Sequence, residues 1–141
     1  YNSAFYRPFS DSIHLPPKSA FIGEPAFYAT ALHELGHWTG HESRLNRDII
    51  NHFGTPLYAR EELRAEIASY MLSEQIGIPF DPSNHAAYVA SWLKMLKQDT
   101  KEILNAAHDA EMIMRYLVDG PREREVPEKH RETATALEEG R

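Results

Sequence analysis

The chain has 141 residues, 42% of them hydrophobic and 26% charged, with a formal net charge of −6. These proportions indicate one globular domain with its own core. The acidic balance argues against a nucleic-acid-binding surface on this segment, since phosphate binding needs clustered Lys and Arg. The chain has no cysteine, which excludes disulfides and thiolate metal sites, so any metal must be held by His, Asp or Glu.

A short strand and then a helix are predicted in the first forty residues. Residues 11–15 alternate polar and apolar side chains and are followed by Pro16 and Pro17, a pattern typical of an edge strand. Pro25 suits the first turn of a helix, and Gly40 is a natural terminator just past its end.

Three further helices are expected downstream of a polar connection at residues 41–56. Apolar periodicity predicts a helix from Tyr58 to about Gln75, with Gly77 and Pro79 ending it. Asp81 or Ser83 is a candidate cap for the next helix, and a last helix is predicted for residues 100–117. We therefore expect a mainly helical domain over residues 1–119 and a mobile tail at 120–141, where apolar residues are few.

No stretch of the sequence suggests a membrane protein. Apolar runs are too short to span a bilayer and no signal peptide is visible, so we expect a cytoplasmic protein without membrane partners. The chain begins at Tyr1 rather than Met, as expected of a fragment of a longer protein.

The segment His33-Glu-Leu-Gly-His37 has the pattern H-E-x-x-H and falls within the first predicted helix. Histidines four residues apart project from one helix face, so His33 and His37 can bind the same ion. Glu34 follows the first ligand directly, where a carboxylate can act as general base without binding the metal. The motif predicts two ligands and a base of a catalytic site.

A catalytic zinc ion usually has three protein ligands, so a third must come from elsewhere. Glu62 and Glu66 are four residues apart on the second predicted helix and share a face that borders its apolar stripe. We expect Glu62 to bind the metal and Glu66 to accept a hydrogen bond from a ligand histidine, with the reverse assignment as the alternative.

His41 is a competing third ligand or a residue supporting the site, because Gly40 could turn the chain back toward His33 and His37. In the related all-histidine pattern, however, the final histidine would fall at Ser43. A hydrolytic site also needs an oxyanion donor. Candidates for that role are Tyr58, His41, Tyr70 and His108, whereas His14, His52, His85 and His130 are interpreted as surface residues.

Taken in order, these residues resemble the zincin-like metallopeptidase domain of ArdC-type antirestriction proteins, which also occurs in TraC-like primases and in polyvalent proteins of plasmids and phages. The resemblance covers about residues 8–118. Its blocks are DSIHLP at 11–16, HELGHWTGH at 33–41, RLNR at 44–47, YAREELRAE at 58–66, and YVASWLKMLK at 88–97 followed by Asp99.

The resemblance implies an α+β fold, mainly helical, with a small N-terminal sheet or edge strand. It further implies a gluzincin-like site in which His33, His37 and Glu62 hold one Zn²⁺ ion. The strand at residues 11–15 would lie above the metal helix and pair with an extended substrate. In the full-length protein, an N-terminal domain that binds single-stranded DNA is also expected.

The function expected from these features is zinc-dependent hydrolysis of a protein or peptide substrate, with Glu34 as general base. The alternative is a zinc-holding binding module that acts in antirestriction or DNA transfer without proteolytic turnover. A purely structural zinc domain is disfavoured because such sites normally use cysteine.

Overall fold

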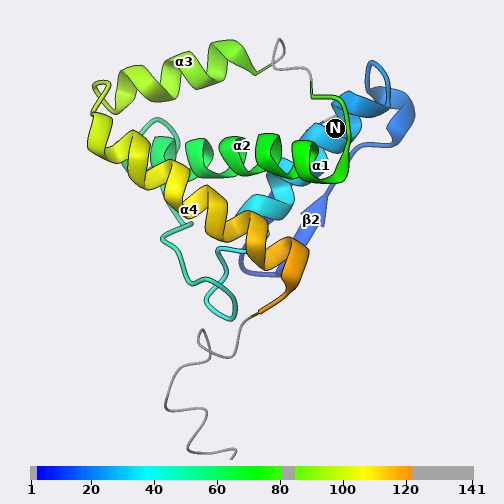
Figure 1. Cartoon of the computed structure of the whole chain (residues 1–141), viewed down its shortest axis with the longest axis horizontal. Helices are drawn as coiled ribbons and strands as arrows, with labels where there is room; N and C mark the ends of the chain where they lie inside the picture. Colours follow the sequence, from blue (N-terminus) through cyan, green and yellow to red (C-terminus); the bar gives the residue numbers. More distant parts are fainter. Residues whose placement is uncertain (1–2, 81–84, 122–141) are drawn as a thin grey trace, which may run out of the picture.

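Helix α2 (Pro56–Ile76) lies at the centre of the fold and contacts each of the other α-helices in the described part of the chain. The computed structural model describes residues 3–80 and 85–121, and Figure 1 shows their arrangement. The other elements are β1 (Phe5–Arg7), β2 (Ser12–His14), the short 3-10 helix η1 (Lys18–Ala20), α1 (Glu24–Trp38), α3 (Ala86–Met95) and α4 (Thr100–Asp119). The expected α+β architecture, mainly helical with a small N-terminal sheet, is confirmed.

The helix ends follow local sequence signals. Thr55 caps α2 because its hydroxyl accepts a hydrogen bond from the Tyr58 backbone N–H at 3.3 Å, and Pro56 occupies the first turn. Gly77 ends the helix with a φ of 76°, in the left-handed region that glycine adopts without strain. The predicted caps at Asp81 and Ser83 and the predicted mobile tail beyond Pro121 lie outside the described residues.

Two apolar clusters join α2 to α3 and α4. One centres on Leu63, Trp92 and Leu96, and the other on Ala68 and Ile113. Small residues recur along the buried side of α2, which lets neighbouring helices approach it closely. No helix in the described part of the chain is both long and apolar enough to cross a membrane.

Helices α1 and α2 approach each other closely at Gly36. A Cβ atom added at Gly36 would lie 3.1 Å from the Cα of Ala65 and 3.3 Å from its Cβ, so glycine permits a backbone approach that a side chain would prevent. His33 and His37 lie on either side of this contact on α1, and Glu62 and Glu66 do so on α2.

The sheet differs from the prediction, because residues 5–7 also form a strand. In the antiparallel pair β1–β2, Tyr6 lies opposite Ile13. The irregular composition around Pro8 concealed β1, which has only three residues. A polar cluster ties this hairpin to the end of α1. Arg44 contacts Asp11, stacks 3.7 Å above the Trp38 ring and donates to the Trp38 carbonyl at 2.7 Å.

Replacing Gly36 with valine should destabilise the fold, because the new side chain meets Ala65 backbone atoms that cannot move independently of α2. We expect a loss of about 1–3 kcal/mol in the free energy of unfolding, measured by chemical denaturation. Ala87→Val, at an exposed position of α3, is the control, with a change within about 0.5 kcal/mol. A Gly36→Val variant as stable as the wild type would contradict this close packing.

Candidate metal centre

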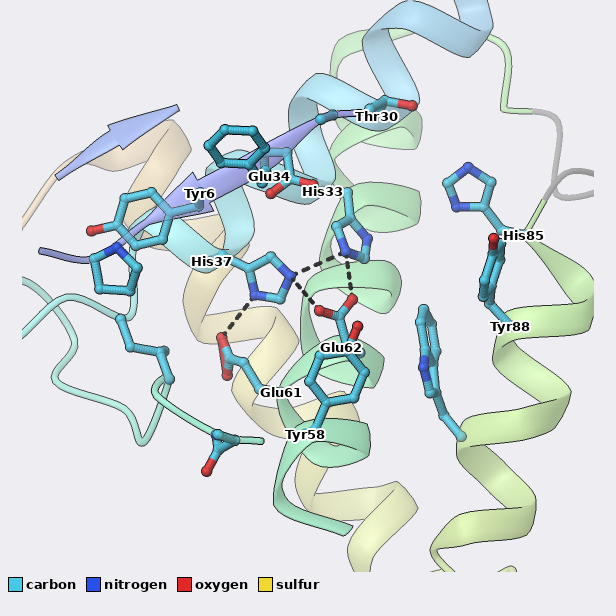
Figure 2. Close-up of a pocket in the computed structure, with 16 residues that line it drawn as sticks. Tyr6, Thr30, His33, Glu34, His37, Tyr58, Glu61, Glu62, His85 and Tyr88 are labelled. Carbon is cyan, nitrogen blue, oxygen red and sulfur yellow. Dashed lines mark hydrogen bonds and ion pairs between the residues drawn. The ribbon is translucent and has the colours of Figure 1, made fainter. Parts of the chain in front are cut away.

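A cavity of about 570 Å³ opens between β1 and the helices α1, α2 and α3 (Figure 2). All residues of the predicted metal-binding triad and Glu34 line it. The remaining lining residues are Ala4, Phe5, Tyr6, Pro8, Thr30, Ile49, Asn51, Tyr58, Glu61, His85, Tyr88 and Trp92.

The predicted ligands His33, His37 and Glu62 converge on one point in this cavity. The Nε2 atoms of the two histidines are 3.1 Å apart. The Glu62 carboxylate bridges them, with Oε2 2.9 Å from His33 Nε2 and Oε1 3.1 Å from His37 Nε2. Each of the three side chains thus contacts the other two, and we call His33, His37 and Glu62 the ligand triangle.

The size of this triangle suits a small divalent cation. A tetrahedral zinc ion with ligands at about 2.0–2.1 Å requires ligand atoms about 3.3 Å apart. The observed separations of 2.9–3.1 Å, which involve both oxygens of Glu62, are only a few tenths of an ångström shorter. Two imidazole nitrogens and one carboxylate are also the donor set of a catalytic rather than a structural zinc site.

Glu66 contacts the other nitrogen of His33. Its Oε2 lies 2.8 Å from His33 Nδ1, so the carboxylate can accept the Nδ1–H hydrogen bond and leave the Nε2 lone pair free for a metal. This geometry supports the prediction that Glu62 is the ligand and Glu66 the group that orients His33.

A second possible ligand group, His33 with Glu66 and His85, shares this histidine. His85 Nδ1 lies 2.9 Å from Glu66, and this half-buried ring lines the cavity, so interpreting His85 as a surface residue was wrong. Ions in both groups would require His33 to coordinate through both nitrogens as an imidazolate. A single ion at Nε2, with Glu66 and His85 as its hydrogen-bonded support, needs no such deprotonation.

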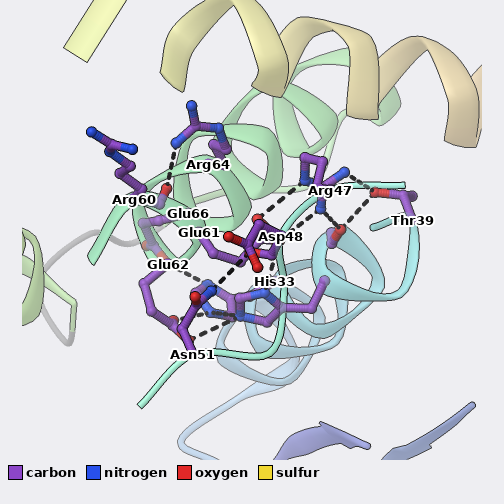
Figure 3. Close-up of polar contacts among 12 residues, drawn as sticks. His33, Thr39, Arg47, Asp48, Asn51, Arg60, Glu61, Glu62, Arg64 and Glu66 are labelled. Carbon is purple, nitrogen blue, oxygen red and sulfur yellow. Dashed lines mark hydrogen bonds and ion pairs between the residues drawn. The ribbon is translucent and has the colours of Figure 1, made fainter. Parts of the chain in front are cut away.

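Glu61 plays the corresponding part for His37, and its role was not predicted. Its Oε1 lies 3.4 Å from His37 Nδ1. Arg47 donates hydrogen bonds to both oxygens of the same carboxylate, at 2.7 and 3.1 Å (Figure 3). It also donates to the Gly36 carbonyl at 2.8 Å. A buried carboxylate needs such a partner, and the bidentate contact sets its direction.

The carboxylates control the protonation of both histidines. Burial disfavours the charged ring of His33, but hydrogen bonds to Glu62 and Glu66 outweigh burial and raise its pKa to about 9. For His37, burial is likewise outweighed by hydrogen bonds to Glu61 and Glu62, and the pKa rises to about 10. Without a metal, both rings are therefore protonated on both nitrogens and positively charged at neutral pH.

Glu34 lies in the cavity outside the ligand triangle, and only 8% of its surface is exposed. Burial raises the pKa of its carboxyl, while the nearby histidines and a hydrogen bond from the Tyr6 backbone N–H oppose that rise. A buried carboxylate with a raised pKa, beside the metal position but not on it, suits proton transfer.

Of the four proposed oxyanion donors, Tyr58 is the one that lines the cavity of the described residues. Burial together with the charge and hydrogen bond of Glu62 raises the pKa of its hydroxyl to about 12. The hydroxyl therefore stays protonated and able to donate. Tyr70 and His108 do not line the cavity.

His41 is separate from the ligand triangle. Helix α1 ends at Trp38, and a turn then carries His41 to a second hollow, where its Nδ1 lies 2.7 Å from the Ser43 hydroxyl. The candidate ligand groups found among the described residues do not include it. The geometry therefore favours Glu62 over His41 as the third ligand.

The strand beside the cavity is β1, not the predicted strand at residues 11–15. Four residues in and around β1 line the cavity, whereas β2 contributes none and serves as the pairing partner of β1. The sequence carried few signals for β1, Arg47 or His85, because each reaches the site through contacts with residues distant in the chain.

Comparisons with known proteins place this chain among related domains. A family model described as a zincin-like metallopeptidase matches residues 1–109. A DNA primase TraC of Escherichia coli is 58% identical over 118 residues, which are 84% of this chain and 11% of the primase. An uncharacterized protein, y4eC of Sinorhizobium fredii, is 37% identical over 117 residues, covering 82% of this chain and 38% of that protein.

Two solved structures of the antirestriction protein ArdC from plasmid R388 are also similar. The Mn(II)-bound structure has a TM-score of 0.71 at 42% identity and covers 84% of this chain and 44% of ArdC. The metal-free structure has a TM-score of 0.64 at 40% identity, covering 85% and 45% respectively. The chain thus spans less than half the length of each of these relatives.

Glu62→Gln and Glu66→Gln should separate the ligand from the orienting carboxylate. We expect Glu66→Gln to weaken zinc binding about 10–100-fold, as is typical when a ligand's hydrogen-bond partner is lost, and Glu62→Gln to weaken it more. Competition with a chromophoric chelator measures both affinities, with Glu74→Gln, exposed on the same helix, as control. The opposite order would assign Glu66 as the ligand.

Zinc affinity should increase with pH between 6 and 8. A metal binds neutral imidazole, and the pKa values of about 9 and 10 mean that the ion must displace protons from His33 and His37. Each displaced proton adds a factor of about ten per pH unit, so the affinity should fall steeply as pH decreases. Calorimetry in buffers of different ionisation enthalpy measures the released protons. Binding without proton release would contradict the assigned protonation states.

Proposed function

This chain belongs to the zincin-like metallopeptidase family, and on that basis we propose that it hydrolyses peptide bonds with one Zn²⁺ ion held by His33, His37 and Glu62. The observation that carries the proposal is the mutual contact of these three side chains, with Glu34 beside them in an open cavity. The similarity to the antirestriction protein ArdC of plasmid R388 supports a role in antirestriction.

The donor set supports zinc, although the same ligands accept manganese, and Mn(II) is the ion named for the ArdC structure. When bound, the ion would polarise the scissile carbonyl and make water easier to deprotonate. The orienting carboxylates Glu61 and Glu66 would keep both imidazole rings in the tautomer that directs Nε2 toward the cavity.

Two side chains and one strand would then have separate roles in hydrolysis. Glu34 would take a proton from the attacking water and deliver it to the leaving amine, since its raised pKa favours holding that proton between the two steps. Tyr58 would donate a hydrogen bond to the developing oxyanion. The strand β1, which borders the cavity, would align an extended peptide.

Glu34→Gln should abolish cleavage while zinc binding persists, because the amide keeps the shape of the side chain but cannot accept the proton. We expect cleavage to fall at least about 100-fold. Mass spectrometry of a peptide mixture measures cleavage, and elemental analysis measures bound zinc. Glu42→Gln, at an exposed position near the end of α1, is the matched control.

Two outcomes would contradict the proposal. Cleavage by Glu34→Gln at the wild-type rate would show that Glu34 is not the base. If the zinc-loaded wild type cleaves no peptide, while antirestriction by the full-length protein persists in Glu34→Gln, the domain is a zinc-holding binding module without turnover.

A further inference from the structure

One wall of the metal-centre cavity is made of aromatic rings. Tyr58 extends from α2 and Tyr88 from α3, as Figure 2 shows, and Trp92 of α3 also lines the cavity. We call these three residues the aromatic wall. Tyr88 and Trp92 are four residues apart on one helix and so share a face.

The aromatic wall begins at a metal ligand and continues to the cavity rim. The Trp92 ring stacks on His33, with centroids 6.3 Å apart and planes inclined by 29°. Tyr88 stacks on Trp92 in the same manner, at 6.2 Å and 27°. Trp92 is 8% exposed but Tyr88 is 64% exposed, so the outer ring has a large face available for contact.

Apart from Glu34, the carboxylates of the described residues that line the cavity already have partners. Glu66 contacts His33 and His85, and Glu62 spans the two ligand histidines. Glu61 is held by Arg47. Placed against Tyr88 and Trp92, a charged substrate side chain would lose hydration and meet few free counter-charges among the described residues, whereas a ring or a large aliphatic group would bury apolar surface.

We propose that the aromatic wall is the specificity pocket for the substrate side chain beside the scissile bond, and that it selects an aromatic or large apolar residue. This inference rests on the proposed peptidase function and extends it by naming the substrate class. The rival occupant is a Lys or Arg side chain, which could make cation–π contacts with the same rings.

A series of N-acetyl amino-acid hydroxamates tests the wall without requiring turnover. The hydroxamate group binds an open zinc position, and the side chain can then be varied among Phe, Leu, Ala, Asp and Lys. With the zinc-loaded chain, we expect the Phe and Leu compounds to bind about tenfold more tightly than the other three.

Variants of Tyr88 test whether the aromatic wall causes the tighter binding of the Phe and Leu compounds. Tyr88→Ala should weaken binding of the Phe compound about tenfold and leave the Ala compound unchanged, because only the former reaches the outer ring. Tyr88→Phe should retain the preference, since the ring face and not the hydroxyl makes the contact. Tyr70→Ala is the control, because Tyr70 packs edge-on against Phe80 and does not line the cavity.

The possible results distinguish a failure of the specificity proposal from a failure of the proposed peptidase function. Equal affinity for all five compounds, tightest binding of the Lys compound, or equal losses in Tyr88→Ala and Tyr70→Ala would overturn the specificity proposal and leave the metal centre standing. If no hydroxamate binds although zinc is present, the open metal position is wrong, and both proposals fail.

Discussion

The close approach of α1 and α2 at Gly36 is the constraint on which the rest of the structure depends. Because Gly36 has no side chain, the α1 backbone lies against Ala65 of α2. This contact brings the histidines of one helix within hydrogen-bonding distance of carboxylates on the other. A wider separation would leave two half-sites, neither able to surround an ion.

Three carboxylates of α2 contact the two histidines in different ways. Glu62 points between the two histidines, while Glu61 and Glu66 each reach the outer nitrogen of one of them. Burying three carboxylates together would be costly without compensation, and the histidines and Arg47 supply it. The arrangement explains why an acidic cluster remains ordered in the interior and why its members are not interchangeable.

The open side of the cavity combines two surfaces of different chemistry. On one side, β1 offers a short strand that is tied through Asp11 and Arg44 to the end of α1. On the other, the aromatic wall of α3 and α2 offers ring faces and few free charges. Substrate backbone and substrate side chain would therefore be recognised by separate elements on either side of the metal centre.

The sequence by itself determined the helices and the motif, because apolar periodicity, prolines and glycines act within a few residues. His33, Glu34 and His37 followed from helix spacing alone, and the pair Glu62 and Glu66 followed from the same four-residue repeat. Only the tertiary structure decided which nitrogen each carboxylate faces, that Glu61 with Arg47 supports His37, and that His85 enters the site. It also showed that β1 is the strand at the cavity. These contacts join residues 14 to 33 positions apart in the chain, and such pairings depend on how helices pack, which no local pattern encodes.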